Sequence, residues 1–341
     1  MDTRDRSEIV LKKGYAKAYT NIALIKYWGK KNKELILPMN NSLSLTLDAF
    51  YSQTSLVFDK KLSADIFVLN DVEQSEKQSK KVVQFMDLVR EKYGVSQFAR
   101  IDSVNTVPTA AGLASSASGF AALAGAVSGA LDLNLSQQEL SQLARRGSGS
   151  ACRSIYGGLS EWVAGSQDDN SQAVPIHADG WEEELAMLFI ILDKKEKAVP
   201  SRDGMELTVQ TSCFYDGWLK QVNQDLADIK EAIADKDFDR FGQIAEANAL
   251  AMHATTLGAR PPFTYWQKES MDAMEQVRKL REDGIFAYFT MDAGPNVKVL
   301  IQKKDSQKAL LYFQKFYPKD KLMLANSGPA IEVWSEDVEN D

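Results

Sequence analysis

Cysteine and histidine are scarce in this chain. Its 341 residues contain two of each, Cys152 and Cys213, and His177 and His253. Two thiols fit a reducing compartment better than a disulfide framework, and four such side chains scattered along the sequence are too few for a zinc site of the usual kind. Binding of a cofactor by oxygen ligands, above all Mg²⁺, is not excluded.

Long apolar runs and an excess of basic residues are also missing. No run approaches the ~20 apolar residues that span a bilayer, and the charged N-terminus MDTRDRSEIVLKKG lacks the apolar core of a signal peptide. The 40 Lys plus Arg are outnumbered by 47 Asp plus Glu, so the net charge is −7 and no overall positive field attracts nucleic acid or acidic lipid. We therefore expect a cytoplasmic protein without a nucleic-acid or membrane partner, in which a bound anion meets a local cluster of cations.

The composition is that of a globular protein, with 44% hydrophobic and 26% charged residues. Apolar runs suited to buried strands, residues 185–192 and 285–291, alternate with long amphipathic stretches. The pattern predicts an α+β fold of two lobes. Residues 1–192 would form a β-rich N-terminal lobe, and residues 193–341 a C-terminal lobe of helices over an antiparallel sheet.

Several individual elements are predicted from local signals. The period-two alternation in residues 42–58 predicts strands with one solvated face. Asn70 is expected to cap an amphipathic helix with Lys77, Lys80 and Lys81 on its solvated face. Small apolar residues predict a central helix from about 113 to 130, and the S-x-x-E pair Ser136 and Glu139 predicts a helix ending at Gly147. Further helices are expected at 212–234, 237–257, 264–281 and 306–316, with residues 193–204 as a polar crossing between lobes and a hairpin turn at 294–296.

Two loops rich in glycine and serine are candidate anion sites. In PTAAGLASSASG, residues 108–119, such a loop runs into a helix start, whose free N–H groups and positive dipole end can hold phosphate. It matches neither a Walker A loop nor a dinucleotide fingerprint, and a tightly packed Ala/Ser helix is an equally good interpretation. In RRGSGSACRSIYGG, residues 145–158, exposed amides are followed by Arg153, a planar bidentate donor. The alternative there is a flexible connection with a surface arginine.

Two shorter segments carry the remaining candidates. In KYWGKK, residues 26–31, an apolar run gives way abruptly to aromatics, a glycine and lysines; taken alone, it is typical of a strand end with surface lysines. In TMDAGPN, Asp292 ends an apolar strand at a tight turn, where a rigidly held carboxylate can reach a cleft. A turn-forming aspartate is the simpler interpretation of that segment by itself.

Together the segments at 18–48, 108–119, 147–158 and 290–296 resemble the signature set of the diphosphomevalonate decarboxylase family within the GHMP kinase superfamily. The resemblance runs from about Ala16 to about Val333. It implies a GHMP kinase-like fold with the active site between the two lobes. It also implies an enzyme of isoprenoid biosynthesis that uses ATP and Mg²⁺ to convert mevalonate 5-diphosphate into isopentenyl diphosphate, CO₂, ADP and phosphate. A homodimer is implied by the resemblance as well.

The resemblance also implies roles for single residues of this chain. The substrate would contact Tyr27, Trp28, Gly29, Lys30, Ser148, Gly149, Ser150, Ala151, Cys152, Arg153, Ser201 and Arg202. ATP would contact Pro108, Ala111, Gly112, Leu113, Ala114, Ser115, Ser116 and Ser118, with Ser115 and Ser116 reaching the metal mostly through the phosphates. The catalytic set would be Asp292, Lys26, Arg153 and Asn21. Where the family pattern has Ser-Ser-Arg, this chain has Pro200, Ser201 and Arg202. The assignment of Ser201 and Arg202 to the substrate therefore depends on a segment that departs from the family pattern.

In the implied reaction, Asp292 accepts the proton of the C3 hydroxyl while that oxygen takes the γ-phosphoryl group, with Lys26 close by. An aspartate has a reference pKa of about 3.9 and is a weak base for an alcohol, so the proton should move late in a loose transition state. Arg153 is the candidate for the substrate carboxylate. Competing interpretations are a mevalonate 3-kinase, a monophosphate decarboxylase, and a nucleotide-binding sensor without turnover, although Asp292 and Lys26 are both present.

Overall fold

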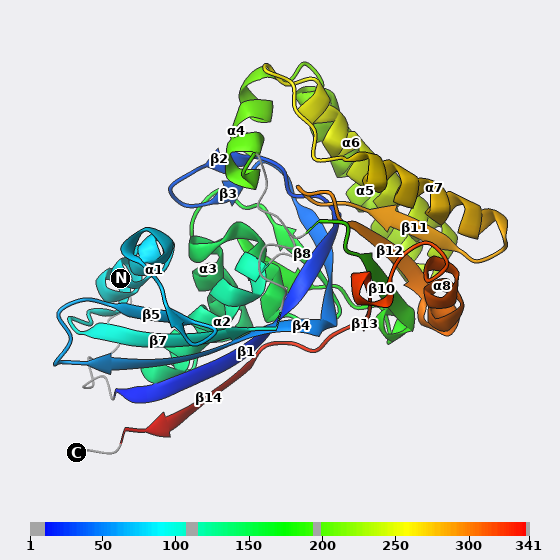
Figure 1. Ribbon diagram of the computed structural model, residues 1–341. Helices are drawn as coiled ribbons and strands as arrows, with labels where there is room; N and C mark the ends of the chain where they lie inside the picture. Colours follow the sequence, from blue (N-terminus) through cyan, green and yellow to red (C-terminus); the bar gives the residue numbers. More distant parts are fainter. Residues whose placement is uncertain (1–10, 107–114, 194–198, 339–341) are drawn as a thin grey trace.

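Two β-sheets, each covered by helices, organise the protein (Figure 1). The structure is a computed structural model that describes residues 11–106, 115–193 and 199–338. The first sheet has the order β14-β1-β4-β7-β5-β6, and β8 and β9 extend it from β4; the second has the order β11-β12-β10-β13. This arrangement confirms the predicted α+β class.

The first sheet contains β1 (Lys12–Ile25), β4 (Ser42–Asp59), β5 (Ile66–Leu69), β6 (Val72–Glu73), β7 (Phe98–Asn105), β8 (Leu159–Val163), β9 (Gln172–Pro175) and β14 (Glu332–Asp337). The second contains β10 (Leu185–Ile190), β11 (Ala287–Thr290), β12 (Val297–Gln302) and β13 (Leu322–Asn326), and a separate hairpin contains β2 (Lys30–Asn32) and β3 (Leu37–Pro38). The helices are α1 (Glu76–Tyr93), α2 (Ser115–Ala130), α3 (Gln137–Gly147), α4 (Ser201–Thr211), α5 (Tyr215–Ala234), α6 (Phe238–Leu257), α7 (Lys268–Glu282) and α8 (Ser306–Phe313). Short 3-10 helices are η1 (Gly149–Ile155), η2 (Trp181–Glu184), η3 (Lys303–Asp305) and η4 (Lys319–Lys321).

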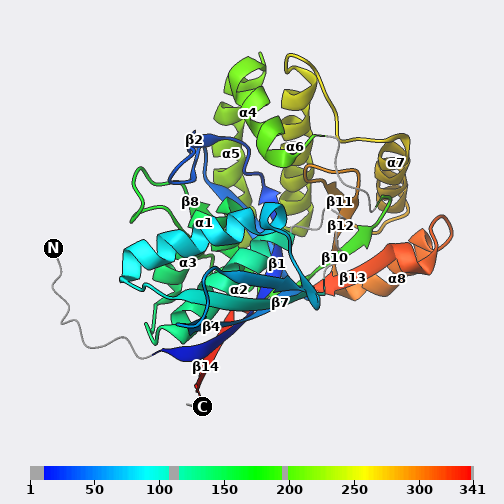
Figure 2. The same cartoon turned by 60° about the vertical axis from the view of Figure 1, so that its left-hand side comes forward.

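Helix α2 lies at the centre of the first lobe, as its small apolar residues predict. It packs against β1 and β4, and its residues from 120 to 130 are buried on almost every side. Short side chains allow this close approach: a Cβ on Gly125 would lie 2.6 Å from the Cβ of Ala16 on β1. Helices α1 and α3 lie beside α2 over the same sheet (Figure 2).

Two helix starts test the capping signals. Ser136 and Glu139 form the predicted capping box, and α3 ends at Gly147 as expected. The prediction for the preceding helix is wrong at its start, because Ser75, not Asn70, is the N-cap of α1. Asn70 has a φ of 49° and lies in the tight turn between β5 and β6, a conformation that asparagine tolerates better than most residues.

Strand β4 differs from its predicted burial. Its first six residues, 42–47, are all buried, and only its later part alternates. The reason is the position of this first part, which pairs with both β1 and β8 and lies next to the C-terminal lobe. Phe50 of β4 and Phe189 of β10 make an edge-to-face contact at 5.1 Å, which joins the cores of the two lobes.

The C-terminal lobe contains an additional helix. The predicted polar crossing at 193–204 is helical from Ser201, because α4 begins directly after Pro200, where a fixed φ is compatible with a helix start. The predicted hairpin is confirmed as β11 and β12, and α5 and α6 end where expected. Helix α7 begins at Lys268 rather than 264, and α8 ends at Phe313 rather than 316.

Each sheet contains strands from both halves of the sequence. Strand β10 pairs with β12 and β13 although it precedes residue 192, and the last strand, β14, returns to pair with β1. The division at residues 1–192 and 193–341 stays a prediction. This interleaving places the ends of β1, α2, α3 and β11 around one region between the lobes (Figure 1).

Candidate active site

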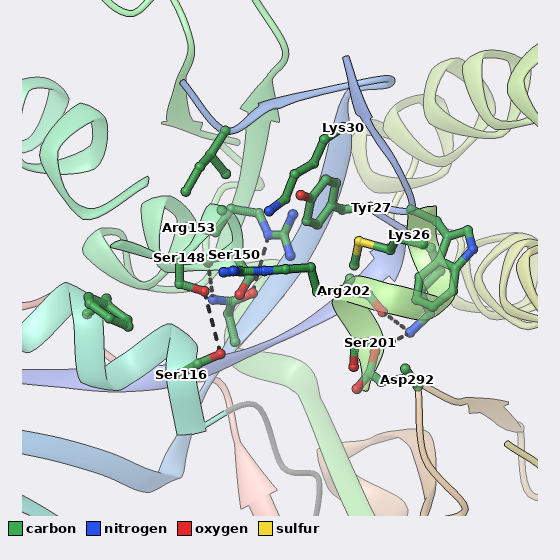
Figure 3. A pocket seen from close by; sticks show the side chains of 18 of the residues that line it. Lys26, Tyr27, Lys30, Ser116, Ser148, Ser150, Arg153, Ser201, Arg202 and Asp292 are labelled. Atoms are coloured by element: carbon green, nitrogen blue, oxygen red, sulfur yellow. Dashed lines mark hydrogen bonds and ion pairs between the residues drawn. The ribbon is translucent and has the colours of Figure 1, made fainter. Parts of the chain in front are cut away.

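A cavity of about 690 Å³ lies where the two lobes meet (Figure 3). Its wall brings together residues from five predicted segments that are far apart in the sequence. Of the predicted residues it includes Asn21, Lys26, Tyr27, Trp28, Lys30, Ser116, Ser148, Gly149, Ser150, Arg153, Ser201, Arg202 and Asp292. Unpredicted residues of the wall include Lys81, Phe120, Met205 and Met252.

Several predicted residues lie elsewhere. Ala151 and Cys152 are fully buried in η1 and are not part of the cavity wall. Ser118 is also fully buried, and its hydroxyl is 2.8 Å from that of Ser52 on β4, so it lies between helix and sheet and does not line the cavity. Pro108, Ala111, Gly112, Leu113 and Ala114 lie outside the described residues, and Ser115 is the first residue of α2.

The segment KYWGKK is anchored from the C-terminal lobe. The indole Nε1 of Trp28 donates to the Thr208 hydroxyl of α4 at 2.8 Å, and the Tyr215 hydroxyl donates to the Trp28 carbonyl at 2.6 Å. Tyr27 packs edge-on against Trp162 at 4.8 Å, and burial raises the pKa of its phenol. Tyr27 and Lys30 are therefore held at the cavity by a rigid backbone rather than lying free on the surface.

Gly29 has a structural reason to be glycine. Its φ is +118°, and a Cβ there would lie 2.0 Å from the Tyr215 hydroxyl oxygen. It is not among the residues that line the cavity.

We expect Gly29→Ala to lower the free energy of unfolding by about 2–3 kcal/mol through backbone strain and displacement of Tyr215. Chemical denaturation measures this, and the exposed Gly217→Ala on α5, whose added Cβ meets nothing within 4 Å, serves as the control. Equal stability of the two variants would contradict the prediction.

The second Gly/Ser loop joins α3 to η1 at the cavity wall. Ser148 donates to the Ser116 hydroxyl of α2 at 3.5 Å, so the two predicted anion loops meet there (Figure 3). Their meeting favours the interpretation of both loops as parts of one anion site. The glycines permit close packing, since a Cβ on Gly147 would lie 2.0 Å from the ring of Phe120.

Arg153 is a buried cation that faces the cavity. Its side chain is 2% exposed, its Nε donates to the Asn21 side-chain oxygen at 3.2 Å, and its terminal nitrogen donates to the Ser42 hydroxyl. No carboxylate lies within ion-pair distance of it among the residues that the structure describes. Asn21 in turn donates to the Ser150 carbonyl at 3.0 Å and the Ser154 hydroxyl at 2.8 Å, which fixes the guanidinium.

Three further cations line the cavity. Lys30, Lys81 of α1 and Arg202 of α4 all line it, and Arg202 is drawn between the serine loop and Asp292 in Figure 3. Burial, together with the charges of Arg202 and Lys81, lowers the pKa of Lys30 to about 8. Burial and Arg202 likewise lower the pKa of Lys81. Mutual repulsion of this kind indicates a site prepared for a multiply charged anion.

Asp292 is held between two lysines. Its Oδ1 is 2.8 Å from the Nζ of Lys26, as predicted, and its Oδ2 is 3.0 Å from the Nζ of Lys298. Burial alone would raise the pKa of Asp292, but the charges and hydrogen bonds of the two lysines outweigh it and hold this pKa far below its usual range. The carboxylate is ionised at every physiological pH.

Burial also lowers the pKa of Lys26, to about 8, against the opposing effect of Asp292. The main chain of Lys26 is fixed on both sides: its N–H donates to Asn248 and its carbonyl accepts from Asn40, each at 2.8 Å. The side chain of Lys26 thus lines the cavity, and hydrogen bonds to Asn40 and Asn248 hold its backbone to both lobes.

Sequence reasoning missed Lys81 and Lys298. Lys81 is exposed on its helix, as predicted, but it also lines the cavity and lies near enough to Arg202 to feel its charge, which the sequence did not indicate. Lys298 is the one lysine inside the apolar run VKVLIQ of β12, and it is 1% exposed. A lysine interrupting a strand that is buried on both faces was an available signal.

Comparison with known proteins identifies the family. The family model "Diphosphomevalonate decarboxylase-like N-terminal domain" matches residues 18–173, and "Mevalonate 5-diphosphate decarboxylase C-terminal domain" matches residues 187–337. The diphosphomevalonate decarboxylase of Debaryomyces hansenii is 35% identical, over 89% of this chain and 83% of its own.

Solved structures agree. That of the mevalonate diphosphate decarboxylase from Enterococcus faecalis is 56% identical with a TM-score of 0.92, and covers 96% of this chain and 100% of its own. The Staphylococcus aureus enzyme is 50% identical with a TM-score of 0.93, covering 95% and 98%. The predicted two-lobed GHMP kinase-like fold is confirmed. The chain belongs to the diphosphomevalonate decarboxylase family.

Proposed function

We propose that this protein uses Mg-ATP to convert mevalonate 5-diphosphate into isopentenyl diphosphate, CO₂, ADP and phosphate. The observation that carries the proposal is the charge of the cavity. Among the residues that the structure describes, its wall contains five cationic side chains, Lys26, Lys30, Lys81, Arg153 and Arg202, and one carboxylate, Asp292. A substrate with a diphosphate at one end and a carboxylate at the other, together with a nucleotide, supplies the missing negative charge.

Known complexes support the choice of ligands. A solved structure of MDDEF, 57% identical to this chain with a TM-score of 0.93, is in complex with MVAPP, AMPPCP and magnesium. In this chain, Lys30, Lys81 and Arg202 suit the diphosphate, and the buried fork of Arg153 suits the substrate carboxylate. The predicted family function, an ATP-dependent carboxy-lyase, agrees with the diphosphomevalonate decarboxylases named among its relatives.

The donor set fits magnesium held mainly by phosphates. In the described part of the chain, no three His, Cys, Asp or Glu side chains converge as a ready metal site. Hydroxyl oxygens suit Mg²⁺, which usually keeps phosphate and water ligands. Ser116, at the cavity wall near the start of α2, would hold it together with ATP. When bound, the ion neutralises phosphate charge during transfer.

The proposed reaction gives each group of the site a step that its position supports. Asp292 accepts the proton of the C3 hydroxyl as that oxygen is phosphorylated, and Lys26 stabilises the negative charge beside it. A carboxylate with such a low pKa is a poor base, so the proton moves late and positioning dominates. Loss of phosphate from C3 then draws electrons from the C–C bond, and the substrate carboxylate leaves as CO₂. The enclosing lobes exclude water from the electron-poor carbon.

One assay separates this function from its rivals. Purified protein is given Mg-ATP with mevalonate, its 5-phosphate or its 5-diphosphate, and ADP and CO₂ are measured together. We expect equal amounts of both from the 5-diphosphate alone. ADP without CO₂ would indicate a 3-kinase, turnover of the 5-phosphate a monophosphate decarboxylase, and ATP binding without ADP formation a sensor. A third cation beside Lys30 and Arg202, Lys81, favours the diphosphate over the monophosphate.

The lowered pKa of Lys30 predicts a pH dependence. Since its pKa is about 8 instead of 10.5, the free protein loses this charge as the pH rises through about 8. Anion binding needs the ammonium form, so the KM for the diphosphate should rise by up to about tenfold per pH unit between pH 8 and 10. Kinetics from pH 6 to 10 measure this.

Lys26 has a similarly lowered pKa and acts at Asp292, so its titration should affect kcat instead. The Lys30→Met variant separates the two lysines. It should have a high KM without the alkaline rise, while the change in kcat stays. A wild-type KM that is constant up to pH 10 would contradict the prediction.

The assembly and location complete the proposal. No described helix has both the length and the apolar character needed to cross a membrane. We propose a homodimer in the cytoplasm, following the family resemblance and the paucity of cysteine. Sedimentation of the purified protein tests the dimer, and cell fractionation tests the location.

A further inference from the structure

Only one of the two lysines that contact Asp292 faces the cavity. Lys26 lines the wall, whereas Lys298 lies behind the carboxylate and is 1% exposed. Their Nζ atoms are 2.8 and 3.0 Å from the two different oxygens of Asp292. The carboxylate therefore has one cation on the substrate side and one on the protein side.

The protein-side lysine projects from a rigid element. Strand β12 lies between β11 and β10, and Lys298 is paired with Thr290 on one side and Phe189 on the other. Lys26 follows the last residue of β1, and its Nζ also donates to the Ala23 carbonyl at 2.8 Å. An anion in the cavity would meet Lys26, which lines the wall, whereas Lys298 is not part of the wall.

We propose that Lys298 is a positioning residue, which holds Asp292 ionised and correctly turned from behind while Lys26 interacts with the anionic substrates. The inference rests on the proposed function. With Lys26 as its only partner, Asp292 would lose its counter-charge whenever an anion attracted that lysine. Burial raises the pKa of Asp292, and the fixed charge of Lys298 opposes this throughout the reaction cycle.

The other groups near Asp292 do not replace Lys298. Arg153 interacts with Asp292 only at longer range and makes its hydrogen bonds to Asn21 and Ser42. His253 of α6 is uncharged there, because burial and the charge of Lys26 lower its pKa to about 3. Lys26 and Lys298 thus supply the cationic contacts of the carboxylate among the described residues.

A purely structural lysine would behave differently on removal. Lys298→Met retains the length of the side chain. It reduces the cluster of three charges to the pair of Lys26 and Asp292, which is neutral overall. Replacing part of a buried charge cluster by an apolar side chain is often neutral or stabilising. We therefore expect the melting temperature to stay within a few degrees of the wild type.

The catalytic effect should appear in kcat. We expect Lys298→Met to lower kcat about 10-fold to 30-fold, with the KM values for ATP and the diphosphate within threefold of wild type. Removing Lys298 raises the pKa of Asp292, so the acid limb of kcat/KM should move to higher pH. Lys298→Arg retains a charge and should recover part of kcat. Thr290→Val, at the buried neighbouring position on β11, is the matched control and should turn over normally.

A double variant tests the dependence on Asp292. In an Asp292→Asn background, the further change Lys298→Met should leave the residual rate unchanged and raise the melting temperature, because one of two uncompensated cations is removed. This stability arm does not need turnover. If the wild type produced no CO₂ from the 5-diphosphate, the proposed function would be wrong. The melting temperatures of the variants would still test the contact between Lys298 and Asp292.

Three results would overturn the inference. They are a kcat of Lys298→Met within twofold of wild type, an equal loss of rate with and without Asp292, or a variant that does not fold. The last counts because a neutral pair should be at least as stable as the cluster of three charges.

Discussion

Replacing Asp292 by asparagine should lower kcat about 10³-fold while the dissociation constants of ATP and the diphosphate change less than tenfold. The amide retains the shape of the carboxylate but cannot accept the proton of the C3 hydroxyl, and general base catalysis typically contributes about 10²–10⁴-fold. It also leaves Lys26 and Lys298 facing each other without a counter-charge. Steady-state formation of ADP and CO₂, with equilibrium binding of each ligand, measures both parts.

The same variant should be less stable. Removing one partner of a buried ion pair costs about 3–5 kcal/mol, and we expect roughly 2–3 kcal/mol because the Asp292 side chain is 25% exposed. The exposed Asp272→Asn on α7 is the control. A variant of Asp292 that retained more than a tenth of the wild-type rate would exclude it as the base, whatever its stability.

Local signals in the sequence predicted much of the fold correctly. The capping box of α3, the hairpin of β11 and β12, and the small-residue helix α2 each depend on residues close together in the chain. The errors came where tertiary packing decides. Asn70 is a plausible N-cap from its residue type, but Ser75 is the N-cap of α1. Helix α4 was not predicted, because its polar sequence has only two buried residues, Gly204 and Thr208.

The site was predicted segment by segment, and its convergence was not visible in the residues alone. Each of the segments around Lys30, Ser148 and Asp292 had a simpler local interpretation, and only the fold places them on one cavity wall. Lys81 shows the limit most clearly, because a lysine on the polar face of a helix gives no sign that the face covers a cavity. Lys81 of α1 and Arg202 of α4 are brought to the same cavity by the fold, and no spacing in the sequence encodes this.

Arg153→Lys retains the positive charge yet should reduce kcat/KM for the diphosphate about 10²-fold, with a smaller effect on ATP. The guanidinium uses one edge for Asn21 and another nitrogen for Ser42, and it still presents donors to the cavity. A single ammonium cannot meet both partners and a substrate carboxylate in the same plane. Losing one such charge-assisted contact costs about 2–5 kcal/mol, which corresponds to this fall in rate.

The matched control is Arg145→Lys on α3. Arg145 is fully buried and also forms hydrogen bonds, to the Leu35 carbonyl and to Asp168, but it does not line the cavity. Its replacement should lower stability and leave the kinetics of the folded fraction normal. If both variants lost stability alone, Arg153 would be a structural arginine like Arg145. If only Arg153→Lys lost turnover, and its KM for the diphosphate rose more than that for ATP, the buried guanidinium would be assigned to the substrate, because both arginines are buried but only Arg153 lines the cavity.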